Sequence, residues 1–85
     1  MQVREKVSSA LSMPKEILLN LPLITATGYE EINIENYKNL VEFTENKIRI
    51  LTNAGLLTID GQKLLLKQIT TENIMVTGRI SGMHW

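Results

Sequence analysis

The chain has 85 residues, of which 44% are hydrophobic and 21% charged, and its nine Lys and Arg residues balance its nine Asp and Glu residues. This length accommodates one domain over residues 1–85, the composition excludes a disordered chain, and the zero net charge provides no overall field to attract nucleic acid or anionic lipid. Cysteine is absent from the sequence, which excludes disulfides, thiolate metal sites and cysteine nucleophiles and favours a reducing compartment.

The N-terminal segment is predicted to form a short amphipathic helix. Val3, Val7 and Leu11 recur at helical spacing within residues 1–12. A helix of this length is marginal in water, so it should dock on the core of the domain or, alternatively, on a membrane surface or a partner. The start lacks the apolar segment of a signal peptide, and the apolar-rich run at residues 17–24 is far shorter than the roughly 20 residues of a transmembrane helix. We therefore expect a cytoplasmic protein.

From Pro22 onward, apolar and polar residues alternate with the two-residue period of β-strands. The segment at residues 23–27 is followed by six more, whose alternating apolar residues are Ile32 and Ile34, Val41 and Phe43, Ile48 and Ile50, Leu57 and Ile59, Leu64 and Leu66, and Ile74, Val76 and Ile80. The pattern predicts about seven short strands between residues 22 and 80, most of them antiparallel to their neighbours.

Turn-forming residues separate the predicted strands. Gly28 and Gly55 stand in two of these turns, and Asp60–Gly61 is the strongest signal, because a type I′ turn needs positive φ at both central positions. Regular short steps joined by tight turns predict a small antiparallel meander.

Two of the predicted strands are apolar on both faces, at residues 56–57 and 64–66. Such strands should be covered on both sides, which favours a small sandwich, a roll or a partly closed barrel over a flat sheet. A β-solenoid is the alternative, although no single repeat length fits all the strand spacings. The predicted fold class is all-β.

Residues with chemical potential are few and dispersed. The only histidine, His84, is the penultimate residue and is predicted to be exposed rather than to bind a metal. Glu30 and Glu31 are adjacent, so on a strand they would face opposite sides and could not share a substrate. We therefore expect no enzyme, no metal and no cofactor. The alternative is a small nucleic-acid-binding β-barrel, but the four aromatic residues form no stripe interleaved with basic residues: Tyr29, Tyr37, Phe43 and Trp85.

The predicted last strand, residues 73–80, is the candidate interaction edge. It carries one charge, Arg79, and lacks the lysines or proline that usually protect an edge, whereas Pro22 protects the first strand. Gly78 would allow a close backbone approach, and Arg79 would either pair with Glu35 or Glu42 or contact a partner. We expect a second copy or another partner to cover this edge by β-augmentation. The candidate interface residues are Met75, Val76, Gly78, Arg79 and Trp85.

A series of short motifs runs in order from about Met13 to Ile80. Pro14 occupies an "LPK"-type entry, Leu21–Pro22 and Ile24–Thr25 an "LPRIT"-type segment, Glu35–Asn36 an "IEN" turn, Thr52, Gly55 and Gly61 a "T..G.L.I.G" series, and Gly78–Arg79–Ile80 a "V.GRI" ending. In this order and spacing the chain resembles the YabP/YqfC family of sporulation proteins, and most of all its YqfC branch. Leu23 stands where that pattern has a basic residue, and Met13 where it has leucine.

The resemblance implies a non-enzymatic protein that supports endospore formation. Family members are made in the mother cell, and the YqfC type is encoded beside a larger membrane protein of sporulation. The implied partner is therefore a YqfD-like membrane protein, and the implied location is the mother-cell cytoplasm or the periphery of the outer forespore membrane.

Overall fold

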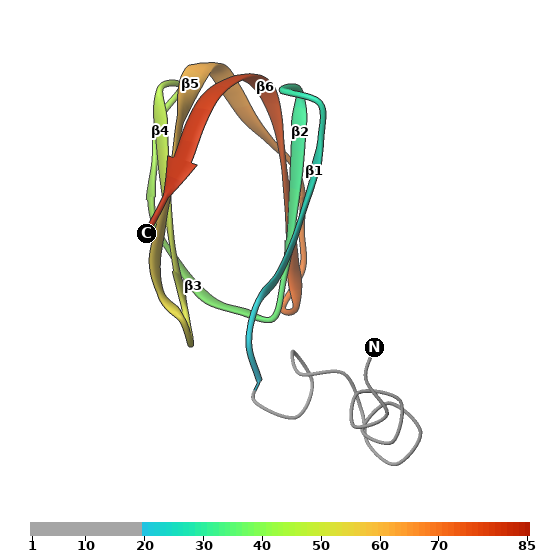
Figure 1. Cartoon of the computed structure of the whole chain (residues 1–85), viewed down its shortest axis with the longest axis vertical. Helices are drawn as coiled ribbons and strands as arrows, with labels where there is room; N and C mark the ends of the chain where they lie inside the picture. The colour runs from blue at the N-terminus through green and yellow to red at the C-terminus, as the bar shows by residue number, and fades with distance from the viewer. Residues whose placement is uncertain (1–19) are drawn as a thin grey trace, which may run out of the picture.

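The computed structural model describes residues 20–85, so the predicted helix at residues 1–12 lies outside the described part of the chain. Six strands follow one another: β1 (Leu23–Thr27), β2 (Glu31–Glu35), β3 (Tyr37–Phe43), β4 (Lys47–Thr52), β5 (Gly55–Ile69) and β6 (Asn73–His84) (Figure 1). They form one antiparallel sheet in the order β1-β2-β6-β5-β4-β3. The predicted all-β class is confirmed, with six strands instead of about seven.

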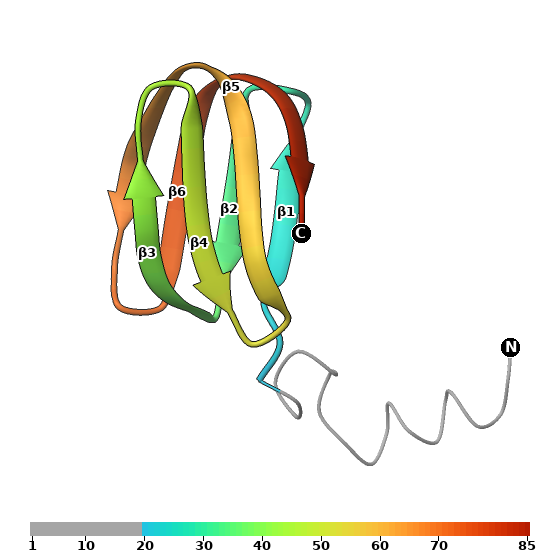
Figure 2. The same ribbon diagram turned by 90° about the vertical axis from the view of Figure 1, so that its left-hand side faces the viewer.

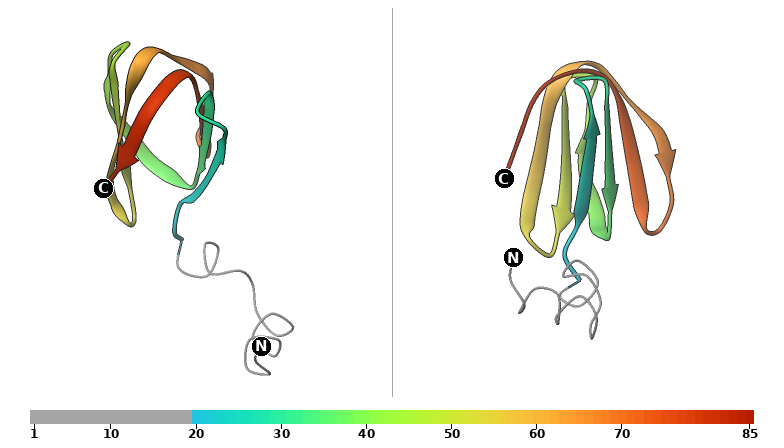
Figure 3. Two further views of the ribbon diagram at one scale, coloured as in Figure 1. Left: turned by 45° about the horizontal axis from the view of Figure 1, so that its top comes forward. Right: turned by 45° about the vertical axis from the view of Figure 1, so that its right-hand side comes forward.

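The sheet bends over on itself because β5 and β6 are long and both curve at their middle (Figure 3). One layer contains β1, β2, the first half of β6 and the second half of β5. The other contains β3, β4, the first half of β5 and the second half of β6. The result is a sandwich made from one folded sheet, neither a closed barrel nor a solenoid. The predicted meander holds for β3 to β6, but β2 pairs with β6 and so departs from it.

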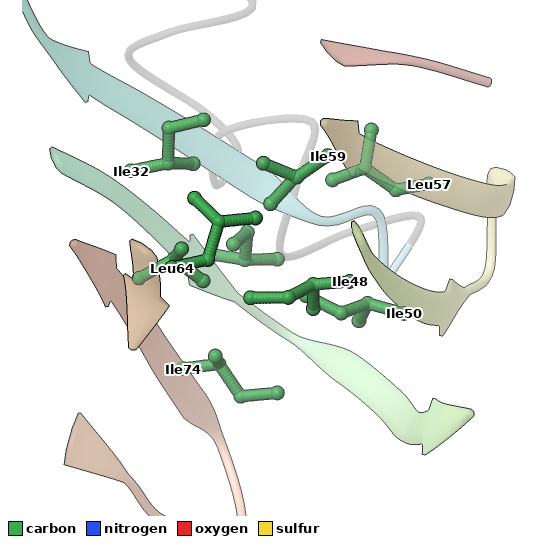
Figure 4. Close-up of a cluster of buried hydrophobic side chains, with 9 residues drawn as sticks. Ile32, Ile48, Ile50, Leu57, Ile59, Leu64 and Ile74 are labelled. Atoms are coloured by element: carbon green, nitrogen blue, oxygen red, sulfur yellow. The ribbon is translucent and has the colours of Figure 1, made fainter. Parts of the chain in front are cut away.

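Nine aliphatic side chains fill the space between the layers (Figure 4). All nine belong to the alternating sets that the sequence predicts, and Leu66, predicted with Leu64, is partly buried against them; the nine are Ile32, Ile34, Ile48, Ile50, Leu57, Ile59, Leu64, Ile74 and Val76. Period-two alternation therefore predicts these core residues correctly, because alternate residues of a strand lie on the same face.

The alternation that was predicted to place Val41 and Phe43 on one face of a strand is interrupted in β3. The register shifts between Leu40 and Glu42, so Leu40 is opposite buried Ile50 and Phe43 is opposite Ile48, while both Val41 and Phe43 remain exposed. A bulge of this kind breaks the alternation on which the prediction depended.

The prediction that the leucine-rich strands are covered on both faces is wrong. Leu57 and Leu64 are buried, but their neighbours Leu56 and Leu65 face outward and are exposed. Within residues 20–85 the outer face of β5 is thus open at these two leucines, although Thr58, between buried Leu57 and Ile59, is also buried.

Gly28 lies in the β1–β2 turn, and Gly55 is the first residue of β5, directly after the β4–β5 turn; both have positive φ. Asp60–Gly61 does not form the predicted hairpin turn. β5 continues through it, and the pairing with β6 shifts register between Asp60 and Gly61 and again between Gln62 and Leu65. The sequence feature that suggested a turn between two strands therefore marks a bend within one strand.

A single residue, Asn36, carries the chain from β2 to β3 and hence from one layer to the other. Its φ of 64° lies in the left-handed region, which asparagine tolerates better than most residues. Its side-chain Nδ2 donates to the carbonyl oxygen of Leu21 at 3.1 Å, and its backbone N–H donates to Glu72 at 2.9 Å. Asn36 thereby joins the start of β1, the β2–β3 corner and the β5–β6 turn.

This geometry predicts the effect of two substitutions at Asn36. Asn36→Ala should lower the free energy of unfolding by about 2 kcal/mol, because it combines left-handed strain with the loss of the hydrogen bond to Leu21. Asn36→Gly should cost less, since glycine adopts positive φ freely. Denaturant unfolding of both variants measures the difference, and equal losses would contradict the strain argument.

Candidate interaction site at the bend of the sheet

The bend is formed where two glycines bring β5 and β6 into close backbone contact. A Cβ on Gly61 would lie 2.2 Å from the carbonyl oxygen of Arg79, and one on Gly78 would lie 2.6 Å from the carbonyl oxygen of Lys63. Gly78 also has a φ of 136°, which side-chain-bearing residues rarely adopt. Gly78 was expected to allow the backbone of a partner strand to approach closely; in the structure the strand that approaches it is β5 of the same chain.

Two turns hold this bend from either side. The β1–β2 turn accepts hydrogen bonds from the Gly78 N–H, at Glu30 O (3.2 Å), and from the Ile80 N–H, at Tyr29 O (2.8 Å). The β3–β4 turn accepts them from the Gly61 N–H, at Asn46 O (3.0 Å), and from the Leu64 N–H, at Glu45 O (2.8 Å). These N–H groups lie just beyond the paired ranges of β2 with β6 and of β4 with β5, and the two turns satisfy them there.

Arg79 lies at the centre of this bend with its side chain exposed. In residues 20–85 its guanidinium makes no ion pair; Glu42, one of its two predicted partners, pairs with Arg49 at 3.5 Å, and Glu35 lies at the far end of β2, opposite Asn73. Arg79 is therefore available to a group outside the described chain.

Two open depressions lie on either side of Arg79, and both are lined by Arg79 and Tyr29. The first, of about 550 Å³, is lined by Thr27, Tyr29, Glu30, Glu31, Thr77, Gly78 and Arg79. The second, of about 560 Å³, is lined by Tyr29, Gly61, Gln62, Arg79, Ile80 and Ser81. Two carboxylates line the first depression and none lines the second, so an acidic group would meet Arg79 with less repulsion from the second side.

Glu30 and Glu31 were expected to face opposite sides of one strand. The structure places Glu30 in the turn, one residue before β2 begins, and both residues line the first depression. The alternation argument does not apply to a residue outside the strand.

The candidate interface residues do not form one surface. Gly78 and Arg79 lie at the bend, whereas Val76 is fully buried in the core and Met75 is half-buried on the outer face of β6. Trp85 is exposed beyond the end of β6, six residues after Arg79, or roughly 20 Å along an extended strand.

Residues 73–80 are not an edge either, because β6 lies between β2 and β5. Tyr29 and Glu30, which approach Arg79 through the β2–β6 pairing, were missed, since no local pattern in the sequence indicates that pairing.

At the C-terminal end of β6, His84 contacts Asp60 across the β5–β6 pair, with Nε2 and Oδ2 3.4 Å apart. Both side chains are substantially exposed. In the described part of the chain, no group of three or more metal-binding side chains comes together. The same residues include no helix of the length and apolar character that crossing a bilayer requires.

The described residues thus define a small β-sandwich built from one bent antiparallel sheet, with an unpaired arginine at the bend. The chain belongs to the YabP family, whose sequence model matches residues 21–85. It is 35% identical over 79 residues to the uncharacterized protein YqfC of Bacillus subtilis (strain 168), and the alignment covers 93% of this chain and 85% of that protein. No solved structure matches the chain. The predicted family is therefore confirmed.

Proposed function

We propose that this protein is a non-enzymatic sporulation protein that acts as an interaction module in the mother cell. Its partner is a YqfD-like membrane protein, and the complex forms at the forespore surface. Membership of the YabP family supports the general assignment. The observation that carries the interaction role is the exposed Arg79 at the bend of the sheet, whose guanidinium makes no ion pair within residues 20–85.

The surroundings of Arg79 suit a protein contact. The bend holds the backbone of residues 78–80 through hydrogen bonds to the β1–β2 turn, so the arginine projects from a fixed position. Arginine and tyrosine are enriched among residues that dominate binding energies, and Tyr29 lines both depressions beside Arg79. An acidic side chain or a carboxyl terminus of the partner would pair with the guanidinium in a bidentate arrangement.

Charge reversal tests this role directly. The tagged chain is co-expressed with the YqfD-like membrane protein, and the membrane protein recovered with it is measured in detergent. Arg79→Glu should reduce recovery about thirtyfold, because an arginine at a binding hot spot contributes about 2 kcal/mol or more.

The matched control is Lys67→Glu, which makes the same charge change at an exposed position of β5 away from the bend. It should retain wild-type recovery. No recovery by the wild-type chain, or equal recovery by Arg79→Glu and wild type with both folded, would contradict the proposal. Binding of single-stranded DNA or RNA that falls steeply with salt would instead support the nucleic-acid alternative.

A further inference from the structure

The two outermost strands of the sheet differ in how well they are protected from pairing with another chain. β3 has two register shifts, between Tyr37 and Asn39 and between Leu40 and Glu42, and it carries Lys38 and Glu42. Bulges and charged residues are the features that natural edge strands use against unwanted pairing. The β3 edge is therefore protected.

β1 has none of these features. Its five residues, Leu23–Thr27, are uncharged, and all five are in unbroken register with β2, from Leu23 opposite Glu35 to Thr27 opposite Glu31. Pro22, which was expected to protect this strand, precedes it and leaves the whole of β1 free of proline. The outer edge of β1 is thus a regular, uncharged ladder of backbone donors and acceptors.

The side of the sandwich at β1 is also incompletely covered. β1 and the end of β6 lie on the same side of the molecule, in opposite layers (Figures 1 and 2). Met83 is opposite Ile59 and so shares its core-facing side, yet Met83 is 41% exposed. Trp85, whose ring lies near Gly55, is 58% exposed. The layer that contains β1 stops before it covers these two side chains.

We propose that a second copy of the chain pairs with β1 in antiparallel orientation, forming a two-fold symmetric dimer in which the sheet layers of the two copies are continuous. Overlap of all five residues places Thr25 on the two-fold axis. Leu23 is then opposite Thr27 of the partner subunit, and Ile24 is opposite Ala26 of the partner subunit, so each larger side chain meets a smaller one. No charge repulsion opposes this pairing, because β1 is uncharged and the chain has zero net charge.

The exposed apolar side chains explain why a strand pair of this length would be stable. Five residues of ladder bury less surface than a standard interface requires. A strand added outside β1 also extends that layer across Met83 and Trp85, and buried tryptophan is a frequent source of binding energy. The dimer does not involve Arg79 and does not depend on the membrane partner, so either proposal can fail without the other.

Disulfide trapping tests both the edge and the register, because the natural sequence has no cysteine. In Thr25→Cys, the two introduced thiols are directly opposite, with Cα atoms about 5 Å apart, which is within disulfide range. In Leu23→Cys, the two thiols are four residues apart, about 13 Å, and cannot join. Under mild oxidation, Thr25→Cys should form a covalent dimer at least tenfold faster than Leu23→Cys or Asn39→Cys, the latter on the exposed outer face of β3.

Solution mass provides a second measurement with the intact protein. At about 100 µM, above a micromolar Kd, the wild-type chain should sediment at twice its mass of 9.6 kDa. Thr25→Lys places the lysines of the two copies directly opposite each other at the axis and should sediment as a monomer. Asn39→Lys should remain dimeric. A monomeric wild type, which would leave β1 to the chain's own N-terminal segment or to another protein, would overturn the proposal. Dissociation by Asn39→Lys in place of Thr25→Lys would overturn it as well.

Discussion

Replacing Gly61 or Gly78 by alanine should cost at least about 3 kcal/mol of stability and lower the melting temperature by about 12 °C or more. The new methyl group of Gly61→Ala would lie 2.2 Å from the carbonyl oxygen of Arg79, and that of Gly78→Ala 2.6 Å from the carbonyl oxygen of Lys63. Both obstacles are backbone atoms, so no side-chain rotation relieves the clash. Gly78→Ala adds the strain of its positive φ.

Gly82→Ala is the matched control for both variants. Gly82 is also in β6, but a Cβ there meets no heavy atom within 4 Å, and its φ is not in the left-handed region. Alanine at this position should leave the melting temperature unchanged or raise it slightly, because glycine loses more conformational entropy on folding. Thermal unfolding followed by circular dichroism compares the three variants. A loss in Gly82→Ala as large as in the other two would show that the effect is not specific to the bend.

The bend also shows where the sequence stops being informative. Asp60–Gly61 has the composition of a type I′ hairpin turn, and a bulge that bends a continuous strand uses the same residue types. The distinction depends on whether residues 62–66 pair with a new strand or continue beside β6, and that pairing connects residues far apart in the sequence. Local patterns therefore predicted the alternating core pairs of β2, β4 and β6 but counted β5 twice.

The residues of the candidate site also differ in whether local sequence patterns could indicate them. Arg79 and Gly78 could be selected from the sequence, because a glycine within a strand and a single charge beside it are both locally unusual. Tyr29 and Glu30 could not, since they reach Arg79 only through the pairing of β2 with β6. One of the two predicted edge strands was misassigned for the same reason: β1 is outermost as expected, but being last in the sequence does not make β6 outermost in the sheet.

Adjacent leucines provide the second large predicted difference. Leu64 is fully buried in the core, and Leu65 is 61% exposed, although the two are chemically identical neighbours in one strand. Leu64→Ala should lower the free energy of unfolding by about 2–5 kcal/mol, because it removes buried methyl groups and leaves a cavity between the layers.

Leu65→Ala should change the free energy of unfolding by less than about 0.5 kcal/mol, because its side chain faces outward, opposite Thr77, and loses little contact with protein. Urea unfolding of the two variants, fitted with a common m-value, measures the contrast at identical composition. A loss at Leu65 comparable to that at Leu64 would mean that the outer face of β5 is covered in the folded protein. The effect would then depend on protein concentration if the cover were a second copy, and would be independent of it if the cover were residues 1–19.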